Sequence, residues 1–109
     1  MTSDGSAINI DPEIFSPDND GTNDVTNITY HFDQPGFTAN VEVFDDRGRL
    51  MTHLVKNELL GTDGTWSWNG ITDKNEKARI GIYIIYMEAF DLKGDVKQYR
   101  KTCVLAAKL

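Results

Sequence analysis

Hydrophobic and polar residues alternate with a period of two along most of the chain. The alternation is clearest in TNITYHF, where Ile28, Tyr30 and Phe32 are separated by polar residues, and it returns in ANVEVF and TWSWNG. Because successive side chains of a strand point to opposite faces, this pattern predicts half-buried β-strands. The run IYIIYMEAF, residues 82–90, is almost wholly apolar and predicts a central strand that is buried on both faces.

No segment has a convincing helical pattern. The apolar spacing of LMTHLVKNELL, residues 50–60, fits a helix, but the segment follows a turn directly and contains the β-branched Thr52 and Val55. We therefore expect a strand as far as Lys56 and a loop after it. The whole pattern predicts an all-β antiparallel sandwich of about seven strands. These strands are expected near residues 7–15, 25–33, 38–45, 49–56, 64–69, 80–90 and 95–106.

Two segments with one shared pattern, FDDRGRL and FDLKGDV, predict hairpin turns between strands. The side chains of Asp45 and Asp91 would accept hydrogen bonds from backbone amides two residues further on. Gly48 and Gly94 would take the positive φ that a short hairpin with a bulge requires. A third turn is expected in TDKNEKA, which contains Asp73 and has an asparagine where the glycine would stand.

The composition describes an acidic globular chain of 109 residues. The net charge is −6 and the pI is about 4.7, so we expect no nucleic-acid partner. No apolar run approaches the ~18 residues of a membrane-spanning helix, so we expect no membrane insertion. Cys103 is the only cysteine, which excludes an internal disulfide, and its apolar surroundings predict a buried, inert thiol. Residues 1–7 have the composition of a linker or chain edge, and residues 8–109 are expected to form one domain.

The segment FSPDNDGTNDV combines carboxylates, amides, proline and glycine between two hydrophobic residues. One interpretation is a calcium loop, because Asp18, Asp20 and Asp24 fall at ligand positions when its glycine is aligned with that of a twelve-residue calcium loop. The other is a rigid corner without a cofactor, in which these side chains accept backbone amides in successive Asx-turns. Phe15 and Val25 would then point inward as anchors at the two ends of the corner.

The tryptophans also allow two interpretations. Trp66 and Trp68 share a strand face, which could be a platform for a sugar or another ligand. Alternatively this face belongs to the core, with one ring packed under the turn after Gly70. The two histidines, His31 and His53, have no nucleophile or metal-binding residues at a recognisable spacing. The sequence therefore predicts no enzymatic site.

The order of these elements resembles the Ig-like domain of flagellar hook-capping proteins. That family has a tyrosine-containing strand, a valine-rich strand, an Asp-x-x-Gly turn, Trp-Asp-Gly, a further turn and Gly-x-Tyr. The corresponding segments here are 28–32, 41–44, 45–48, 68–70, 73–76 and 81–83. Trp-Asn-Gly replaces Trp-Asp-Gly, and the further turn lacks its glycine. The resemblance implies that the expected sandwich is Ig-like.

The segment FSPDNDGTND adds a second resemblance, to gliding-motility-associated C-terminal domains, also described as type B sorting domains of the type IX secretion system. Their signature is Phe-Thr/Ser-Pro-Asn-Gly-Asp-Gly-x-Asn-Asp, and the matching residues here are Phe15, Pro17, Asp20, Gly21, Asn23 and Asp24. The ending QYRKTCVLAAKL departs from the Val-Thr-Leu-Ile-Arg-like terminus of that family.

This second resemblance implies a non-enzymatic C-terminal accessory domain of a secreted or cell-surface bacterial protein. Some members of the family end proteins that also contain lamin-tail-like domains. The partners would be other domains of the same parent protein and the export or anchoring machinery. The alternative is a calcium-stabilised β-sandwich module that binds carbohydrate or another surface ligand.

Overall fold

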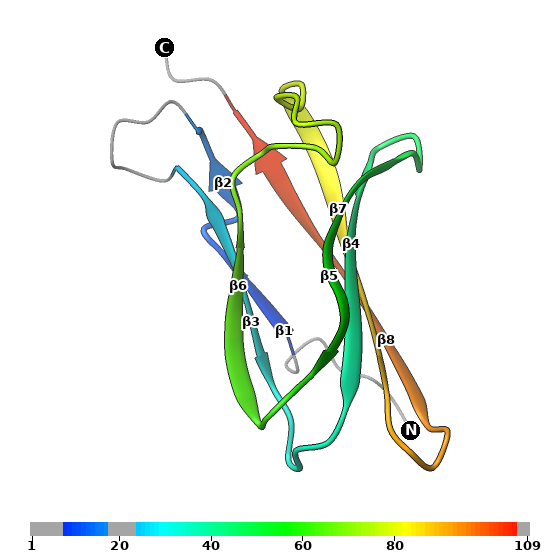
Figure 1. The fold of residues 1–109 in the computed structure, drawn as a ribbon. Coiled ribbons are helices and arrows are strands. Elements are labelled where there is room, and N and C mark those ends of the chain that lie inside the picture. Colours follow the sequence, from blue (N-terminus) through cyan, green and yellow to red (C-terminus); the bar gives the residue numbers. More distant parts are fainter. Residues whose placement is uncertain (1–7, 18–23, 107–109) are drawn as a thin grey trace.

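The chain folds into two β-sheets that pack face to face (Figure 1). The computed structural model describes residues 8–17 and 24–106, and these ranges contain no helix. The strands are β1 (Ile8–Asp11), β2 (Ile14–Phe15), β3 (Thr26–His31), β4 (Thr38–Asp45), β5 (Leu50–Leu59), β6 (Asp63–Trp68), β7 (Gly81–Phe90) and β8 (Val96–Leu105). The small sheet has the order β1-β3-β6 and the large sheet the order β2-β8-β7-β4-β5. The predicted all-β, Ig-like sandwich is confirmed, with eight described strands in place of about seven.

The first expected strand, residues 7–15, is divided into β1 and β2. β1 pairs with β3 in the small sheet, whereas β2 pairs in parallel with β8 in the large sheet. Pro12 lies between the two strands and has no N–H to donate to a strand ladder. The chain therefore crosses between the sheets here, and β2 is the one described strand that departs from the antiparallel prediction.

β5 is longer than expected. It continues past Lys56 to Leu59, so the prediction of a loop after Lys56 is wrong. The pairing of β5 with β4 contains register shifts, and Asn57 has a positive φ of 48°. The N–H of Asn57 donates to the side chain of Asn40 on β4, at 2.9 Å. The register shifts thus allow β5 to remain paired with β4 as far as Leu59.

β7 lies in the middle of the large sheet, as predicted, but only one of its faces is buried. Tyr83, Ile85 and Met87 point into the core, whereas Ile82 on the opposite face is 50% exposed. The prediction of burial on both faces is wrong because the small sheet covers only the inner face, and no other described segment covers the outer one. The outer-facing apolar residues of β7 therefore lie at the surface of the molecule.

The core lies between the sheets and follows the predicted alternation. Ile28, Tyr30 and Phe32 all point inward, toward the buried face of β4 and β7. Cys103 is buried on β8, and this burial raises the pKa of its thiol to about 12. The predicted burial of this thiol is thereby confirmed. None of the described residues forms a helix that could cross a membrane.

Tyr83 fastens the loop that leads into β7. Its hydroxyl donates a 2.6 Å hydrogen bond to the carbonyl of Arg79, four residues earlier. A tyrosine near the start of the equivalent strand makes this backward contact in immunoglobulin domains, where it is called the tyrosine corner. Here the contact holds the backbone of Arg79 beside the end of the sandwich.

Candidate functional site

Asp45 organises the hairpin between β4 and β5. One carboxylate oxygen accepts the N–H groups of Arg47 and Arg49 at 2.9 and 2.8 Å, and the other accepts Nε of Arg49 at 2.7 Å. These bonds, above all the one from the backbone of Arg49, lower the pKa of Asp45. Gly48 has a φ of 83°, the predicted positive value. The hairpin is therefore closed by its own side chain.

Asp91 repeats this arrangement between β7 and β8. Its carboxylate accepts the N–H groups of Lys93 and Asp95 at 2.9 and 3.0 Å, and Gly94 has a φ of 90°. Because β4 and β7 are antiparallel, the two hairpins lie at opposite ends of the sandwich (Figure 1). The shared Asp-x-x-Gly pattern thus marks both ends of the large sheet.

Asp73 lies in the third expected turn but bonds to another part of the chain. It accepts the hydroxyl of Thr52 and Nδ1 of His53, both at 2.7 Å, and the backbone N–H of His53. The side-chain bond from His53, followed by that from Thr52, lowers the pKa of Asp73 to about 2. The turn itself is closed by Thr72, whose hydroxyl accepts two backbone amides, and Asn75 has the expected positive φ.

The aspartate-rich segment falls largely outside the described residues. Asp18 and Asp20 are not described, and Asp24 is half-buried, so calcium binding by these three carboxylates stays a prediction. Among the described residues, no group of three or more His, Cys, Asp or Glu side chains could hold a metal ion.

The two expected anchors of this segment behave differently. Phe15 is buried, as predicted, but Val25 is only partly buried. Thr26 points inward in its place because it shares its strand face with Ile28 and Tyr30. The Thr26 hydroxyl donates to the carbonyl of Pro12 at 2.8 Å, which ties the start of β3 to the crossover of the chain.

The two tryptophans do not form an open platform. Trp68 is 2% exposed, and its Nε1–H donates to the carbonyl of Ile71 at 3.0 Å, so its ring lies under the turn after Gly70. Trp66 is half-buried and stacks on Tyr30 with ring centroids 4.8 Å apart. Its Nε1–H donates to Glu58 at 3.2 Å. Trp68 is a core residue, and Trp66 borders the core.

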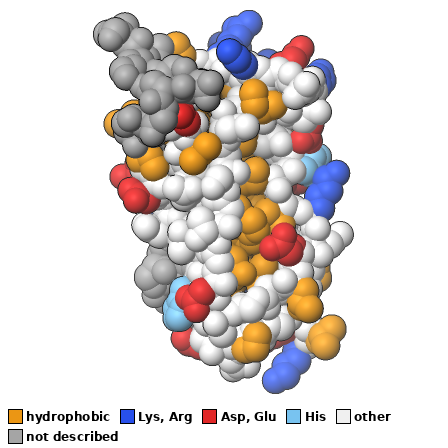
Figure 2. Space-filling view, turned by 60° about the vertical axis from the view of Figure 1, so that its left-hand side comes forward, with side chains coloured by type: hydrophobic (Ala, Val, Ile, Leu, Met, Phe, Trp, Pro, Cys, Tyr) orange, Lys and Arg blue, Asp and Glu red, His pale blue; other side chains and the backbone are white. Residues whose placement is uncertain are grey.

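The outer face of the small sheet is polar, and its side chains bond to one another across β3 and β6. Figure 2, which looks onto this side of the molecule, shows few charged side chains beside a vertical band of hydrophobic side chains. The cross-strand bonds are His31–Asp63, Thr29–Thr65 and Asn27–Ser67. The bond to Asp63 raises the pKa of His31. The polar side chains of this face thus have hydrogen-bond partners within the sheet while they remain exposed to water.

The outer face of the large sheet is apolar at one end. Across neighbouring strands, Val104 of β8 pairs with Ile14 of β2 on one side and with Ile82 of β7 on the other. Ile84 of β7 pairs with Phe44 of β4. Ile14 is 59% exposed. We call this surface the apolar face; it comprises Ile14, Phe44, Leu50, Ile82, Ile84 and Val104.

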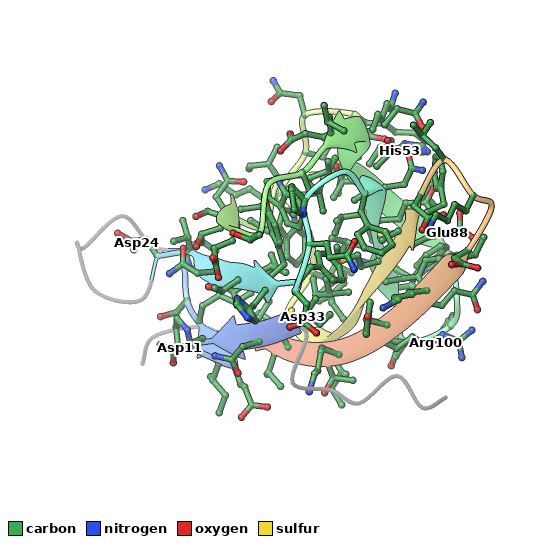
Figure 3. All side chains as sticks on the ribbon, turned by 90° about the horizontal axis from the view of Figure 1, so that it is seen from below. Asp11, Asp24, Asp33, His53, Glu88 and Arg100 are labelled. Atoms are coloured by element: carbon green, nitrogen blue, oxygen red, sulfur yellow. The ribbon has the colours of Figure 1, made fainter. Side chains whose placement is uncertain are left out.

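Polar residues follow the apolar face along the same strands. The guanidinium of Arg100 lies over the ring of Tyr86, 5.6 Å from its centroid, and Gln98 contacts Glu88 at 3.4 Å. Figure 3 shows Arg100 and Glu88 on the outer side of this sheet, far from Asp11 of the small sheet. These polar residues separate the apolar face, at the end of the sheet that carries the β4–β5 hairpin, from the exposed Val96 and Leu59 at the other end.

An open groove of about 700 Å³ adjoins the apolar face. It lies between the β4–β5 hairpin and the loop that leads into β7. We call it the end groove; its lining includes Arg47, Leu50, Lys74, Lys77, Arg79 and Ile82. Sequence reasoning missed this site because its two walls are more than 20 residues apart in the chain.

Comparison with known proteins adds a family match. The family model described as CHU_C Type IX secretion signal domain matches residues 8–105, nearly the whole chain. No curated protein matches the chain. A solved structure of PorZ, described as an essential bacterial surface component of the type-IX secretion system of Porphyromonas gingivalis, is similar over 94% of this chain at 23% identity. The TM-score is 0.47 and the match spans 12% of that chain, so this likeness supports no conclusion about function.

Proposed function

Because the chain belongs to the CHU_C type IX secretion signal domain family, we propose that it is a non-enzymatic accessory domain through which export or anchoring machinery recognises a longer protein. Type IX secretion signal domains mark bacterial proteins that are secreted or attached to the cell surface. The other domains of the parent protein would perform its activity, and this domain would direct where that activity is delivered.

The apolar face is the observation that carries the recognition role. Exposed apolar side chains gathered on one face commonly mark a contact surface, whereas scattered ones do not. On this chain they share neighbouring register positions on β2, β8, β7, β4 and β5. The opposite side of the sandwich is polar and internally hydrogen-bonded. This asymmetry supports a contact surface on the large sheet.

The described titratable groups support a non-catalytic role. His31 and His53 each bond to an aspartate and thereby link two segments of the fold. Cys103 is buried, with a pKa of about 12, so its thiol is protonated at neutral pH. The two histidines thus make contacts within the fold, and the thiol is enclosed in the core.

The alternative of a ligand-binding module has less support. The candidate platform was Trp66 and Trp68, yet Trp68 is buried and Trp66 is covered by Tyr30 on one side. Calcium bound by Asp18, Asp20 and Asp24 stays a separate proposal, since a cation could stabilise the domain under either function.

A secretion assay tests the proposed function. The chain is fused to a reporter enzyme behind a signal peptide, in a bacterium that has a type IX secretion system. We expect the reporter in the medium or on the cell surface, and retention in the periplasm when the system is deleted. Export that survives the deletion would contradict the proposal.

Paired variants locate the recognised surface. In the double variant Ile14→Thr with Ile82→Thr, we expect the reporter to stay in the periplasm, because both side chains belong to the apolar face. Leu59→Thr with Leu92→Thr is the matched control, since these two leucines are even more exposed but lie outside that face. Equal export of both double variants would show that the apolar face is not recognised.

A further inference from the structure

We propose that the end groove binds an extended peptide segment of a protein partner, and that this segment carries carboxylates separated by apolar residues. The inference rests on the proposed recognition role and specifies the chemistry of the partner. It is carried by the charge of the groove, by the apolar side chains along it and by the rigidity of its two walls.

The groove is lined by more basic than acidic residues, although the chain as a whole is acidic. The chain has a net charge of −6, yet five of its 11 Lys and Arg residues line this groove, including three of its four arginines. Arginine presents a planar fork that matches a carboxylate with two parallel hydrogen bonds. Such concentration of arginine indicates recognition of carboxylate groups.

Part of the negative charge in the groove is already engaged. Asp45 pairs with Arg49, and Asp73 accepts hydrogen bonds from Thr52 and His53. Arg47 and Arg79 form no ion pair within the described residues. The same holds for the lysines of the groove, which leaves four cations against three carboxylates, those of Asp46, Asp73 and Glu76. The groove therefore offers a surplus of positive charge to a partner.

Exposed apolar side chains stand among these cations. Ile80 is 65% exposed, and Leu50 and Ile82 also line the groove while belonging to the apolar face. Protein interfaces commonly combine an apolar centre with a charged rim. A uniformly charged polymer fits less well, because Asp46 and Glu76 would repel closely spaced anions. A peptide with interspersed carboxylates can avoid those two positions.

Both walls of the groove are held in place before any partner arrives. Asp45 closes one wall by bonding the hairpin backbone, and Asp73 ties the other wall to β5. Tyr83 fixes the carbonyl of Arg79. A preorganised site loses less conformational freedom on binding, which favours affinity. The volume of about 700 Å³ is within the usual range of ligand sites, roughly 300–1,000 Å³.

Selection from an array of random octapeptides tests the proposal with the full chain. We expect the retained peptides to be enriched in Asp and Glu interspersed with Leu, Ile and Val. Arg47→Glu with Arg79→Glu should weaken binding of the strongest peptide by about tenfold or more, measured by fluorescence anisotropy. Circular dichroism and a thermal melt establish that this variant is folded.

The control is Lys93→Glu with Lys56→Glu, which changes the net charge by the same amount. Lys93 holds the same place in the β7–β8 hairpin as Arg47 holds in the β4–β5 hairpin, at the other end of the sandwich. This control should leave affinity unchanged. An equal loss in both variants would show that net charge, and not the groove, attracts the peptides.

Three further outcomes would overturn the proposal. They are retained peptides without acidic enrichment, stronger binding to heparin, and stronger binding to phosphatidylglycerol vesicles than to any peptide. The secretion assay separates this inference from the proposed function. If the system exports the reporter but the arginine variant binds peptides normally, only the groove assignment fails. If groove binding is lost in the arginine variant but export does not need the system, only the export role fails.

Discussion

The ring of Tyr30 lies directly over Gly64, its partner across β3 and β6. A Cβ atom on Gly64 would come 2.5 Å from the Tyr30 ring carbon Cε2, a distance that atoms do not tolerate. The missing side chain lets Tyr30 stack on Trp66 and tilt against Phe32, with centroids 4.8 and 5.9 Å away. One glycine thus shapes an aromatic cluster at the margin of the core.

Gly64→Ala should therefore destabilise the domain by about 1–3 kcal/mol, the usual cost of forcing extra volume into a packed site. Urea unfolding measures the change. Gly61→Ala is the control, since no atom lies within 4 Å of the position of its Cβ and its φ is not positive. Equal unfolding midpoints for the two variants would mean that Tyr30 moves aside without cost.

The positive-φ glycines should differ in their response to alanine. Gly48→Ala should cost roughly 1 kcal/mol, because only the backbone conformation opposes the new side chain. Gly70→Ala should cost more, because a Cβ there would also lie 3.0 Å from Leu105 and 3.3 Å from Pro17. Chemical denaturation ranks the two variants. A larger loss at Gly48 would contradict this reading of the contacts.

Acid should weaken the tie between Asp73 and β5. The pKa of Asp73 is lowered from 3.8 to about 2 in the folded chain, so the carboxylate stabilises the fold above pH 3.8. This contribution is lost as pH falls from 3.8 toward 2. Asp73→Asn should reduce the pH dependence of stability in that window, measured by urea unfolding at several pH values. An unchanged slope would show that Asp73 is not the titrating group.

A rise in pH above 6.5 should weaken the pair of His31 and Asp63. The pKa of His31 is raised above 6.5 by its bond to Asp63, so the stabilisation is complete below pH 6.5. It is lost as pH rises through the raised value. His31→Gln should flatten the stability profile above pH 6.5. A profile that stays the same in the variant would assign the slope to other groups.

Fluorescence quenching distinguishes the two tryptophans. Trp66→Phe leaves Trp68 as the sole fluorophore, and its burial should protect it from acrylamide. Trp68→Phe leaves Trp66, which should be quenched more readily because it is half-buried. If acrylamide quenched both tryptophans freely, the result would favour the alternative that Trp66 and Trp68 form a ligand platform.

Thermal melts in calcium and in chelator test the aspartate-rich segment. We expect equal midpoints, because the corner interpretation requires no cation. A site that binds only the native state would add ~2.7 kcal/mol at a hundredfold excess of calcium over its dissociation constant. A large rise in calcium that Asp20→Ala abolishes would instead establish a calcium-dependent module.

The sequence alone determined the features that depend on neighbouring residues. The alternation of Ile28, Tyr30 and Phe32 predicted which side chains point inward, because strand geometry is local. The Asp-x-x-Gly pattern predicted the closed turns at Gly48 and Gly94, because the bonding groups lie within five residues of one another. Ring packing under the turn after Gly70 was one of two interpretations that the sequence allowed, and the structure assigns it to Trp68.

Only the tertiary structure decided which surfaces are covered and which distant residues meet. Whether Ile82 is buried depends on a second layer over the large sheet, and no local pattern states whether that layer exists. The crossover at Pro12 and the placing of Arg47 and Arg79 around one groove depend on how the strands pair across the chain. Burial and the joining of distant side chains are set by long-range packing, which is why the proposed binding surface became visible only in the folded domain.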